Sequence, residues 1–257
     1  KLNLTENTQP AIFLASYCIF EIIKKEFGYD FKKFKYFAGH SLGEYSALAC
    51  VGSISFEDTL KILQKRGKFM QEAVPSGEGA MLAVLGMASK ELDKILETNN
   101  KKYECFIAND NSNLQVVVSG LKKDINLLSD DLNNKKIKNL KLNVSAPFHC
   151  KYMKTASEKM TSYINDLKMN ELEKPIVSNV TANETNSSKE IKSLLISQIE
   201  KKVRWLESVE YMINNGVKNF VEIGPGKVLS GLIKRINKNV NVNSINSEED
   251  IKLLIND

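Results

Sequence analysis

Residues 35–49, KYFAGHSLGEYSALA, decide how the rest of the chain is interpreted. An apolar run of strand type leads into a Gly-x-Ser-x-Gly sequence, and apolar residues at helical spacing follow it. A strand that reverses directly into a helix crowds the chain at the turn, so we expect sterics to require both Gly39 and Gly43. Ser41 is predicted to stand at the tip of this turn, beside the free N–H groups of the first helical turn. Such N–H groups stabilise negative charge on a substrate oxygen, which is the geometry that acyl transfer needs.

Length and composition bound the class of protein. A chain of 257 residues suits one large domain, or a large domain that carries a smaller insertion. The longest apolar run, residues 11–20, is too short to cross a bilayer, so we expect no membrane span. The positive charge is nearly all lysine and forms no basic stripe interleaved with aromatic residues, which argues against nucleic-acid binding. A basic surface is still suited to an acidic protein partner.

The cysteines and histidines argue against a disulfide framework and a metal site. The four cysteines are widely scattered and contain no Cys-x-x-Cys pair, which indicates a reducing compartment and thiols used as small apolar residues. The only histidines are His40 and His149, so a histidine-rich metal cluster is excluded.

The order of predicted elements indicates a smaller unit inserted into a larger one. After the breaker sequence PSGEG at residues 75–79, residues 80–143 predict a β-α-β-β-α-β order, which is the ferredoxin-like pattern. Outside this segment strands alternate with helices, which predicts a mostly parallel sheet covered on both faces. Helices are expected over residues 9–27, 56–74, 154–167, 191–200 and 205–212, with a final helix ending at residue 236, and strands over residues 175–179 and 220–223. The sequence thus predicts a core from residues 1–77 and 143–257, and a small subdomain from residues 78–142.

Arg66 is the unusual residue of the predicted helix over residues 56–74. It lies near the apolar side of that helix, three residues after Leu63 and four before Met70. A guanidinium among apolar neighbours needs an anionic partner, because an unpaired buried charge is costly. One interpretation is a snorkelling side chain or a structural ion pair. The other is functional: this lysine-rich chain has only three arginines, so Arg66 indicates a need for the planar, bidentate guanidinium.

His149 is the candidate base for Ser41. A serine hydroxyl needs a neighbouring base to become a useful nucleophile, and histidine is the usual one. His40 adjoins Ser41 in the turn, where successive side chains diverge, so it is poorly placed. His149 lies in a proline-containing loop after a predicted strand, although an ordinary surface histidine is the alternative. A backbone carbonyl holds an Nδ1 proton as well as a carboxylate does. Cys150 beside it is expected to be structural, because adjacent side chains point apart.

Several motifs follow one another along nearly the whole chain. They are TENTQPAIFLAS, GHSLGEYSAL, QKRGKFMQ, GAMLAVLG, VSAPFH, VRWLESVEYM and EIGPGKVLSGLIKRI. In this order and spacing the chain resembles the malonyl-CoA:acyl carrier protein transacylase family of type II fatty acid synthesis. The resemblance implies an α/β-hydrolase-like core that carries the ferredoxin-like subdomain. It also implies transfer of a malonyl group from malonyl-CoA to the phosphopantetheine thiol of acyl carrier protein through a malonyl-serine, with no cofactor and no metal.

The resemblance implies roles for the residues that carry the reaction. Ser41 would be the acylated nucleophile, and His149 the general base and acid. Arg66 would hold the malonyl carboxylate. The backbone N–H of Leu42 would supply one oxyanion donor, and the backbone carbonyl of Gln198 would orient the histidine.

Three further residues are implied to line the acyl pocket, namely Met70, Phe148 and Asn109. Phe148 occupies the position that restricts larger α-substituted acyl groups, which favours a malonyl substrate.

The sequence departs from the family pattern at its start. The family begins with a strand and a Gly-Gln-Gly-Ser-Gln turn, whose glutamine N–H is the second oxyanion donor, and this sequence has no such turn. We expect an N-terminal segment to be missing, and a polypeptide without it to be severely impaired, because losing one oxyanion donor costs roughly 10² to 10³ in rate.

The abundance of lysine and asparagine is typical of an A+T-rich genome. It fits a bacterial cytoplasm or the stroma of a plastid-type organelle, and we favour the organelle because the start is missing. Two rival functions stay open at this point: a serine esterase or thioesterase on the same fold, and a non-catalytic module that docks acyl carrier protein.

Overall fold

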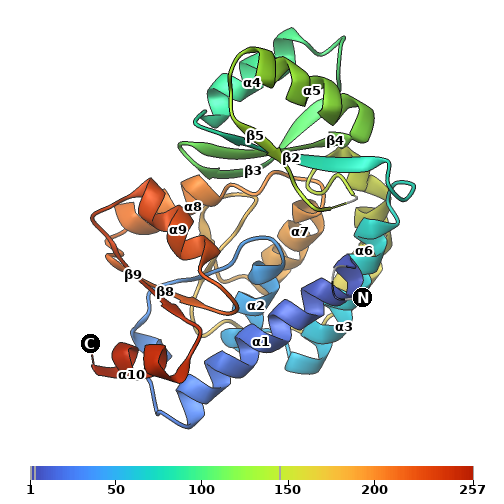
Figure 1. Ribbon diagram of the computed structural model, residues 1–257. Helices are drawn as coiled ribbons and strands as arrows, with labels where there is room; N and C mark the ends of the chain where they lie inside the picture. The colour runs from blue at the N-terminus through green and yellow to red at the C-terminus, as the bar shows by residue number, and fades with distance from the viewer. Residues whose placement is uncertain (1, 3, 145, 257) are drawn as a thin grey trace.

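The computed structural model describes residues 2, 4–144 and 146–256. Ser145 of the VSAPFH motif lies outside these residues. The chain forms a large body and a smaller unit, which lies at the top of Figure 1. The helices are α1 (Thr5–Lys25), α2 (Leu42–Cys50), α3 (Phe56–Gln71), α4 (Ser89–Thr98), α5 (Lys122–Asn134), α6 (Lys154–Asn165), α7 (Ser188–Gln198), α8 (Trp205–Asn214), α9 (Val228–Ile236) and α10 (Glu248–Asn256), with short 3-10 helices η1 (Phe31–Lys33) and η2 (Lys151–Met153).

The strands of the large body form two small sheets. In the first, β1 (Phe37–Ala38) runs parallel to β6 (Ile176–Val177), which pairs antiparallel with β7 (Glu184–Thr185). In the second, β8 (Asn219–Ile223) runs parallel to β9 (Asn241–Ile245). The expected α/β alternation and parallel pairing are therefore observed. The single helix-covered sheet is not, because the described strands are short and divided between two sheets.

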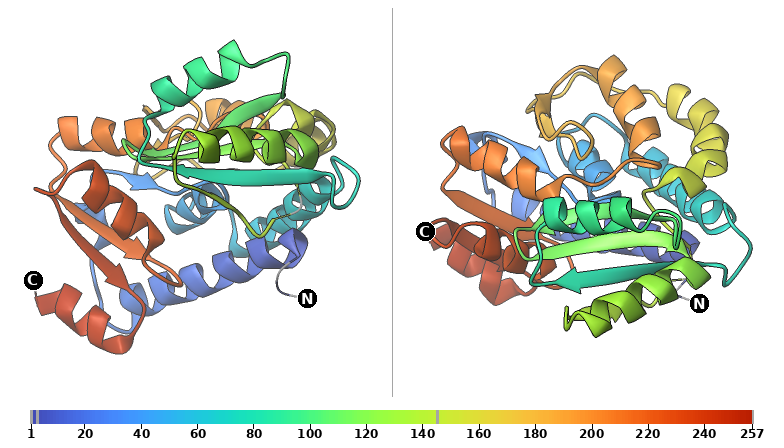
Figure 2. Two further views of the ribbon diagram at one scale, coloured as in Figure 1. Left: turned by 45° about the horizontal axis from the view of Figure 1, so that its top comes forward. Right: turned by 90° about the horizontal axis from the view of Figure 1, so that it is seen from above.

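The smaller unit contains a four-stranded antiparallel sheet. Its elements follow the predicted β-α-β-β-α-β order: β2 (Gly79–Leu85), α4, β3 (Cys105–Ser112), β4 (Gln115–Leu121), α5 and β5 (Asn139–Lys141). The strands lie in the order β3-β4-β2-β5. Seen from above, α4 and α5 lie over one face of this sheet (Figure 2).

The alternation of side chains along β2 explains how this sheet joins two cores. Leu82 and Val84 are buried among apolar residues of α4 and α5. Met81 and Ala83 point the opposite way and share a cluster with Phe148, which belongs to the large body. Because successive side chains of a strand alternate between faces, one strand packs against both units.

The structure corrects the predicted elements at both ends of the large body. Helix α1 begins at Thr5, four residues before the predicted start. The helix that ends at residue 236 is not the last, because β9 and α10 follow it. Strand β9 was missed because its sequence, NVNSI, carries exposed asparagines, and asparagine is depleted in strands. The short strand β7 was not predicted either, and it lies in the polar segment 181–188.

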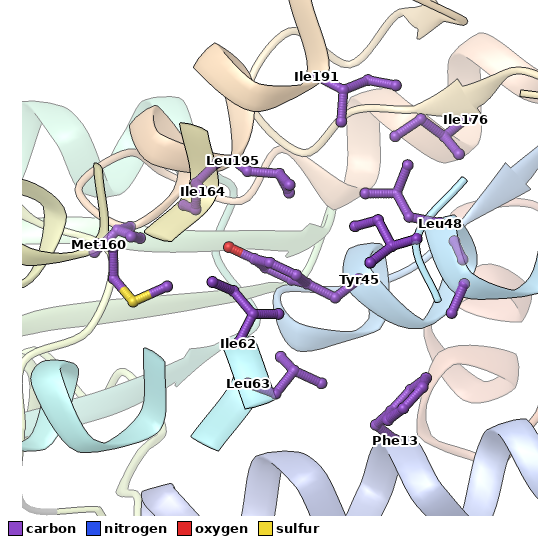
Figure 3. Close-up of a cluster of buried hydrophobic side chains, with 14 of the residues drawn as sticks. Phe13, Tyr45, Leu48, Ile62, Leu63, Met160, Ile164, Ile176, Ile191 and Leu195 are labelled. Atoms are coloured by element: carbon purple, nitrogen blue, oxygen red, sulfur yellow. The ribbon is translucent and has the colours of Figure 1, made fainter. Parts of the chain in front are cut away.

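The main hydrophobic core is built by helices of the large body. Figure 3 shows Tyr45 of α2 among side chains of α1, α3, α6 and α7. Met70 also belongs to this core, with 1% of its surface exposed. Helices α1 and α3 pack closely at Gly67, where an added Cβ would lie 2.5 Å from the Thr5 carbonyl oxygen. This close approach brings Gln9 of α1 next to Arg66 of α3. Within the described residues, no helix is both long and apolar enough to span a membrane.

Candidate active site

Ser41 sits at the reversal between β1 and α2, as predicted. Its backbone has φ +54° and ψ −108°, a conformation that side-chain-bearing residues rarely adopt. A Cβ at Gly39 would lie 2.0 Å from backbone atoms of Gly43, so sterics do require glycine there. The same expectation is wrong for Gly43, where an added Cβ meets nothing within 4 Å. An added Cβ at Gly43 would therefore point into open space.

Ser41 and His149 meet although 108 residues separate them along the chain. Ser41 Oγ lies 2.8 Å from His149 Nε2, and His149 Nδ1 lies 2.8 Å from the carbonyl oxygen of Gln198. Because a carbonyl oxygen only accepts, Nδ1 carries the proton and Nε2 is left to accept from the serine hydroxyl. Burial, together with the charge of Arg66, lowers the pKa of His149 to about 3. The imidazole is therefore neutral at physiological pH and able to take a proton.

Arg66 is buried beside the nucleophile, with 1% of its surface exposed. Nη1 donates to Gln9 Oε1 at 2.6 Å, and Nη2 donates to Gln198 Oε1 at 2.9 Å and to Ser41 Oγ at 3.1 Å. The guanidinium also lies over the ring of Tyr45, 5.5 Å from its centroid. The burial excludes a snorkelling side chain.

Arg66 also lacks the structural ion pair that the sequence left open. Among the described residues, no carboxylate lies within 4.0 Å of its guanidinium nitrogens. Both glutamines that hold it are neutral, so they orient the cation without cancelling its charge. A buried cation without a counterion is costly unless an anion binds there. The guanidinium therefore places a positive charge beside Ser41 that no described carboxylate pairs with.

A buried polar network holds the backbone of the turn at Ser41. The Ser41 N–H donates to Asn179 Oδ1 at 2.7 Å, and Asn179 Nδ2 donates to the Gly39 carbonyl oxygen at 2.7 Å. Gln198 Nε2 donates to the Ser41 carbonyl oxygen at 3.0 Å and to Glu44 Oε2 at 2.7 Å. The strained turn is therefore held at several backbone atoms, which is what such a conformation needs to persist.

Three residues of this site were not predicted from the sequence, namely Gln9, Glu44 and Asn179. Gln9 and Glu44 lie inside the quoted motifs TENTQPAIFLAS and GHSLGEYSAL, so the motifs contained them without revealing their role. The signal that they share is a polar side chain on the buried side of an apolar helix. Asn179 follows strand β6 and gives no comparable signal.

His40 points to a different part of the structure. Its Nε2 lies 2.8 Å from Asn111 Oδ1, and its ring lies 5.7 Å from that of Trp205. Burial lowers the pKa of His40. The expectation that His40 is not the partner of Ser41 is thus confirmed by its geometry.

Comparison with known proteins assigns the chain to a family. The family described as "Acyl transferase domain" matches residues 1–251. The chain is 41% identical over 261 residues to "Malonyl CoA-acyl carrier protein transacylase" of Bacillus subtilis (strain 168), covering 99% of this chain and 80% of that protein. The chain belongs to this transacylase family.

Solved structures of the transacylase family agree with this fold. The acyl-carrier-protein-S-malonyltransferase of Bartonella henselae has a TM-score of 0.95 and 37% identity, covering 99% of this chain and 82% of that one. A type II PKS acyl-carrier protein in complex with its malonyl-transacylase has a TM-score of 0.94 and 36% identity, covering 99% of this chain and 82% of the matched chain.

The transacylase resemblance also assigned an oxyanion donor and three acyl-pocket residues, and the structure shows where each lies. Within the described residues no acceptor faces the N–H of Leu42, the first residue of α2, so this donor is available to a substrate oxygen. Phe148 is half-buried between two apolar clusters. Met70 lies within the main core, and Asn109 is a buried residue of β3 that bridges to Val203. Their roles in an acyl pocket stay predictions.

A cavity of about 600 Å³ adjoins the imidazole. It is lined by His149 and Cys150 together with residues of α4, β3 and the segment 200–202. The Cys150 thiol donates to the Pro147 carbonyl oxygen at 3.0 Å, and burial raises its pKa to about 12. It is thus an inert thiol, as expected for a structural residue. In the described part of the chain, no group of three or more His, Cys, Asp or Glu side chains is placed to hold a metal ion.

Proposed function

We propose that the protein transfers the malonyl group of malonyl-CoA to the phosphopantetheine thiol of acyl carrier protein, through a malonyl-Ser41 intermediate. The observation that carries this proposal is the buried Arg66 guanidinium, which lacks a counterion and donates a hydrogen bond to the hydroxyl that His149 contacts. A nucleophile, a neutral base and a fixed cation within one hydrogen-bonded group suit an acyl donor that carries a carboxylate.

The chemistry follows from the hydrogen bonds. Ser41 Oγ attacks the thioester carbonyl carbon while its proton moves to His149 Nε2, and the Gln198 carbonyl stabilises the imidazolium through Nδ1. The Leu42 N–H is the proposed donor to the oxyanion. As the carbon–sulfur bond breaks, the proton on Nε2 passes to the coenzyme A sulfur. The thiol of acyl carrier protein then reverses these steps, giving its proton to His149 and taking the malonyl group from Ser41.

The relatives support the substrate and the partner. The Bacillus subtilis relative is named for malonyl-CoA and acyl carrier protein. One of the similar solved structures is a type II PKS acyl-carrier protein in complex with its malonyl-transacylase. The formal net charge of +5 suits an acidic protein partner. No cofactor is proposed, because coenzyme A enters as part of the substrate and leaves as a product.

We also propose the two-part organisation predicted from the sequence. Support for an α/β-hydrolase-like core in residues 1–77 and 143–257 comes from the strand–serine–helix reversal at Ser41. Support for a ferredoxin-like subdomain in residues 78–142 comes from its β-α-β-β-α-β order and its antiparallel strand order β3-β4-β2-β5. Met70, Phe148 and Asn109 are retained as proposed acyl-pocket residues.

The compartment stays a prediction. The relative used above is bacterial, and this supports an enzyme of bacterial type. It lends no weight to the organelle over a bacterial cytoplasm.

The decisive experiment is intact-mass analysis after incubation with malonyl-CoA. The wild type should gain one malonyl group, Ser41→Ala should gain none, and added holo acyl carrier protein should remove the group from the enzyme and carry it. An enzyme that releases malonate equally fast without carrier protein would instead be a hydrolase. A protein that binds carrier protein and never becomes acylated would be a docking module.

A further inference from the structure

Glu44 is a buried acid that has no role in the proposed mechanism. It lies three residues after Ser41 in α2, with 1% of its surface exposed. Its Oε2 accepts from the side-chain Nε2 of Gln198 at 2.7 Å and from the backbone N–H of Asn179 at 3.2 Å. A buried carboxyl group needs such partners, yet neither of them is a cation. Its position suggests that it organises these two residues.

The contacts of Gln198 leave its side-chain amide only one orientation. Its Nε2 faces Glu44 Oε2 and the Ser41 carbonyl oxygen, both of which accept hydrogen bonds from it. Its Oε1 faces Arg66 Nη2, which can only donate. A flipped amide would point its NH₂ group at the guanidinium and its oxygen at the two acceptors, so these three hydrogen bonds would be lost. Glu44 supplies the shortest of the contacts that prevent this flip.

Gln198 therefore joins the base, the cation and the nucleophile. Its backbone carbonyl holds His149, its side-chain oxygen holds Arg66, and its side-chain nitrogen holds the Ser41 backbone. The neutral amide lies between the Glu44 carboxyl group and the Arg66 guanidinium, and it leaves the guanidinium available to a substrate anion.

We propose that Glu44 is a positioning residue: its carboxyl group locks the Gln198 amide so that the amide oxygen holds the Arg66 guanidinium toward Ser41, and it thereby supports selection of acyl groups that carry a carboxylate. This inference rests on the proposed transacylase function. It extends that function by placing selectivity partly in a side chain that never touches the substrate.

The test compares malonyl and acetyl transfer in two Glu44 variants. Glu44→Met removes the acceptor, so kcat/KM for malonyl transfer should fall at least tenfold, and the malonyl-to-acetyl ratio at least fivefold. Glu44→Gln retains an oxygen that accepts from both donors, so it should stay within about threefold of wild type. Asp124→Asn, which alters a buried acid in α5 of the smaller unit, is the control and should leave the ratio unchanged.

A double variant separates positioning from general damage. If Glu44 acts through Arg66, then adding Glu44→Met to Arg66→Ala should lower malonyl transfer less than threefold further. Two results would overturn the proposal. Glu44→Met could lower malonyl and acetyl transfer equally, or it could lower malonyl transfer as much in the Arg66→Ala variant as in the wild type. If Glu44→Met does not fold, Gln198→Met takes its place, because it keeps the backbone carbonyl that holds His149 and removes only the amide.

The wild-type measurement in the same series separates the two proposals. A wild type that never forms malonyl-Ser41 would reject the transacylase function itself. An active wild type whose malonyl-to-acetyl ratio is insensitive to Glu44→Met and Gln198→Met would reject only the positioning role.

Discussion

At the scale of single residues, Arg66 should determine which acyl group is transferred. A charge-assisted hydrogen bond contributes roughly 1.5 to 3 kcal/mol, and a bidentate contact more. Arg66→Ala should therefore lower kcat/KM for malonyl transfer at least tenfold, and should spare or improve acetyl transfer. Steady-state transfer to holo acyl carrier protein with each thioester measures both. Arg235→Ala, which removes an exposed arginine that contacts Gln115, is the matched control. Equal losses with both acyl groups would show that Arg66 is only structural.

The low pKa of His149 predicts the acid limb of the pH profile. A general base works above its pKa, and burial with the nearby Arg66 charge lowers that of His149 to about 3. The rate of malonyl-Ser41 formation should therefore show no His149 titration near pH 6.5, the ordinary histidine value. Burial and the Arg66 charge are the two main causes of this low pKa. Arg66→Ala removes the charge, so it should raise the pKa of His149. Stopped-flow acylation across pH 5 to 8 tests this, and a wild-type half-loss near pH 6.5 that follows His149 would contradict it.

At the scale of elements, the reversal from β1 into α2 depends on one glycine more than on the other. Gly39→Ala would place a Cβ 2.0 Å from Gly43 backbone atoms, so it should lower the free energy of unfolding by more than about 3 kcal/mol. Gly43→Ala has open space and replaces a helical glycine, so it should stabilise the protein by roughly 0.5–1 kcal/mol. Urea denaturation of both variants measures the difference, and similar destabilisation of the two would refute the steric account.

At the scale of the whole molecule, Glu44 links stability to pH. Burial raises the pKa of Glu44 to about 7 from its ordinary 4.5, although hydrogen bonds from Gln198 and Asn179 and the charge of Arg66 oppose the rise. The folded state then binds the proton more tightly than the unfolded state, so this contribution to stability is complete below pH 4.5 and is lost as pH rises through about 7. The free energy of unfolding should fall by up to about 3 kcal/mol over this pH range.

Comparison with Glu44→Gln isolates this effect from the other titrating groups. The variant carries no charge at this position, so its free energy of unfolding minus that of wild type should rise as pH increases from about 4.5 to above 7. His149 contributes the opposite slope, because its folded pKa lies below its ordinary value, but it does so in both proteins and cancels in the difference. Urea titrations at several pH values provide the measurement. A difference that does not change with pH would contradict the raised pKa.

The sequence by itself determined the local features of this protein. The glycine before Ser41, the helical periodicities and the β-α-β-β-α-β order depend on sterics and on side chains that are neighbours along one element, so they can be predicted from the order of residues. The asparagine-rich strand β9 escaped prediction because it forms only through pairing with β8.

Only the tertiary structure decided how the site is held together. The hydrogen bonds of Gln9 and Gln198 with Arg66 and with the Ser41 backbone join residues that lie between 57 and 157 positions apart. A polar residue on a helix does not show in the sequence which atom it will face, because that depends on how distant helices pack. The absence of a counterion for Arg66 within the described residues, and the lock that Glu44 places on Gln198, are properties of that packing alone.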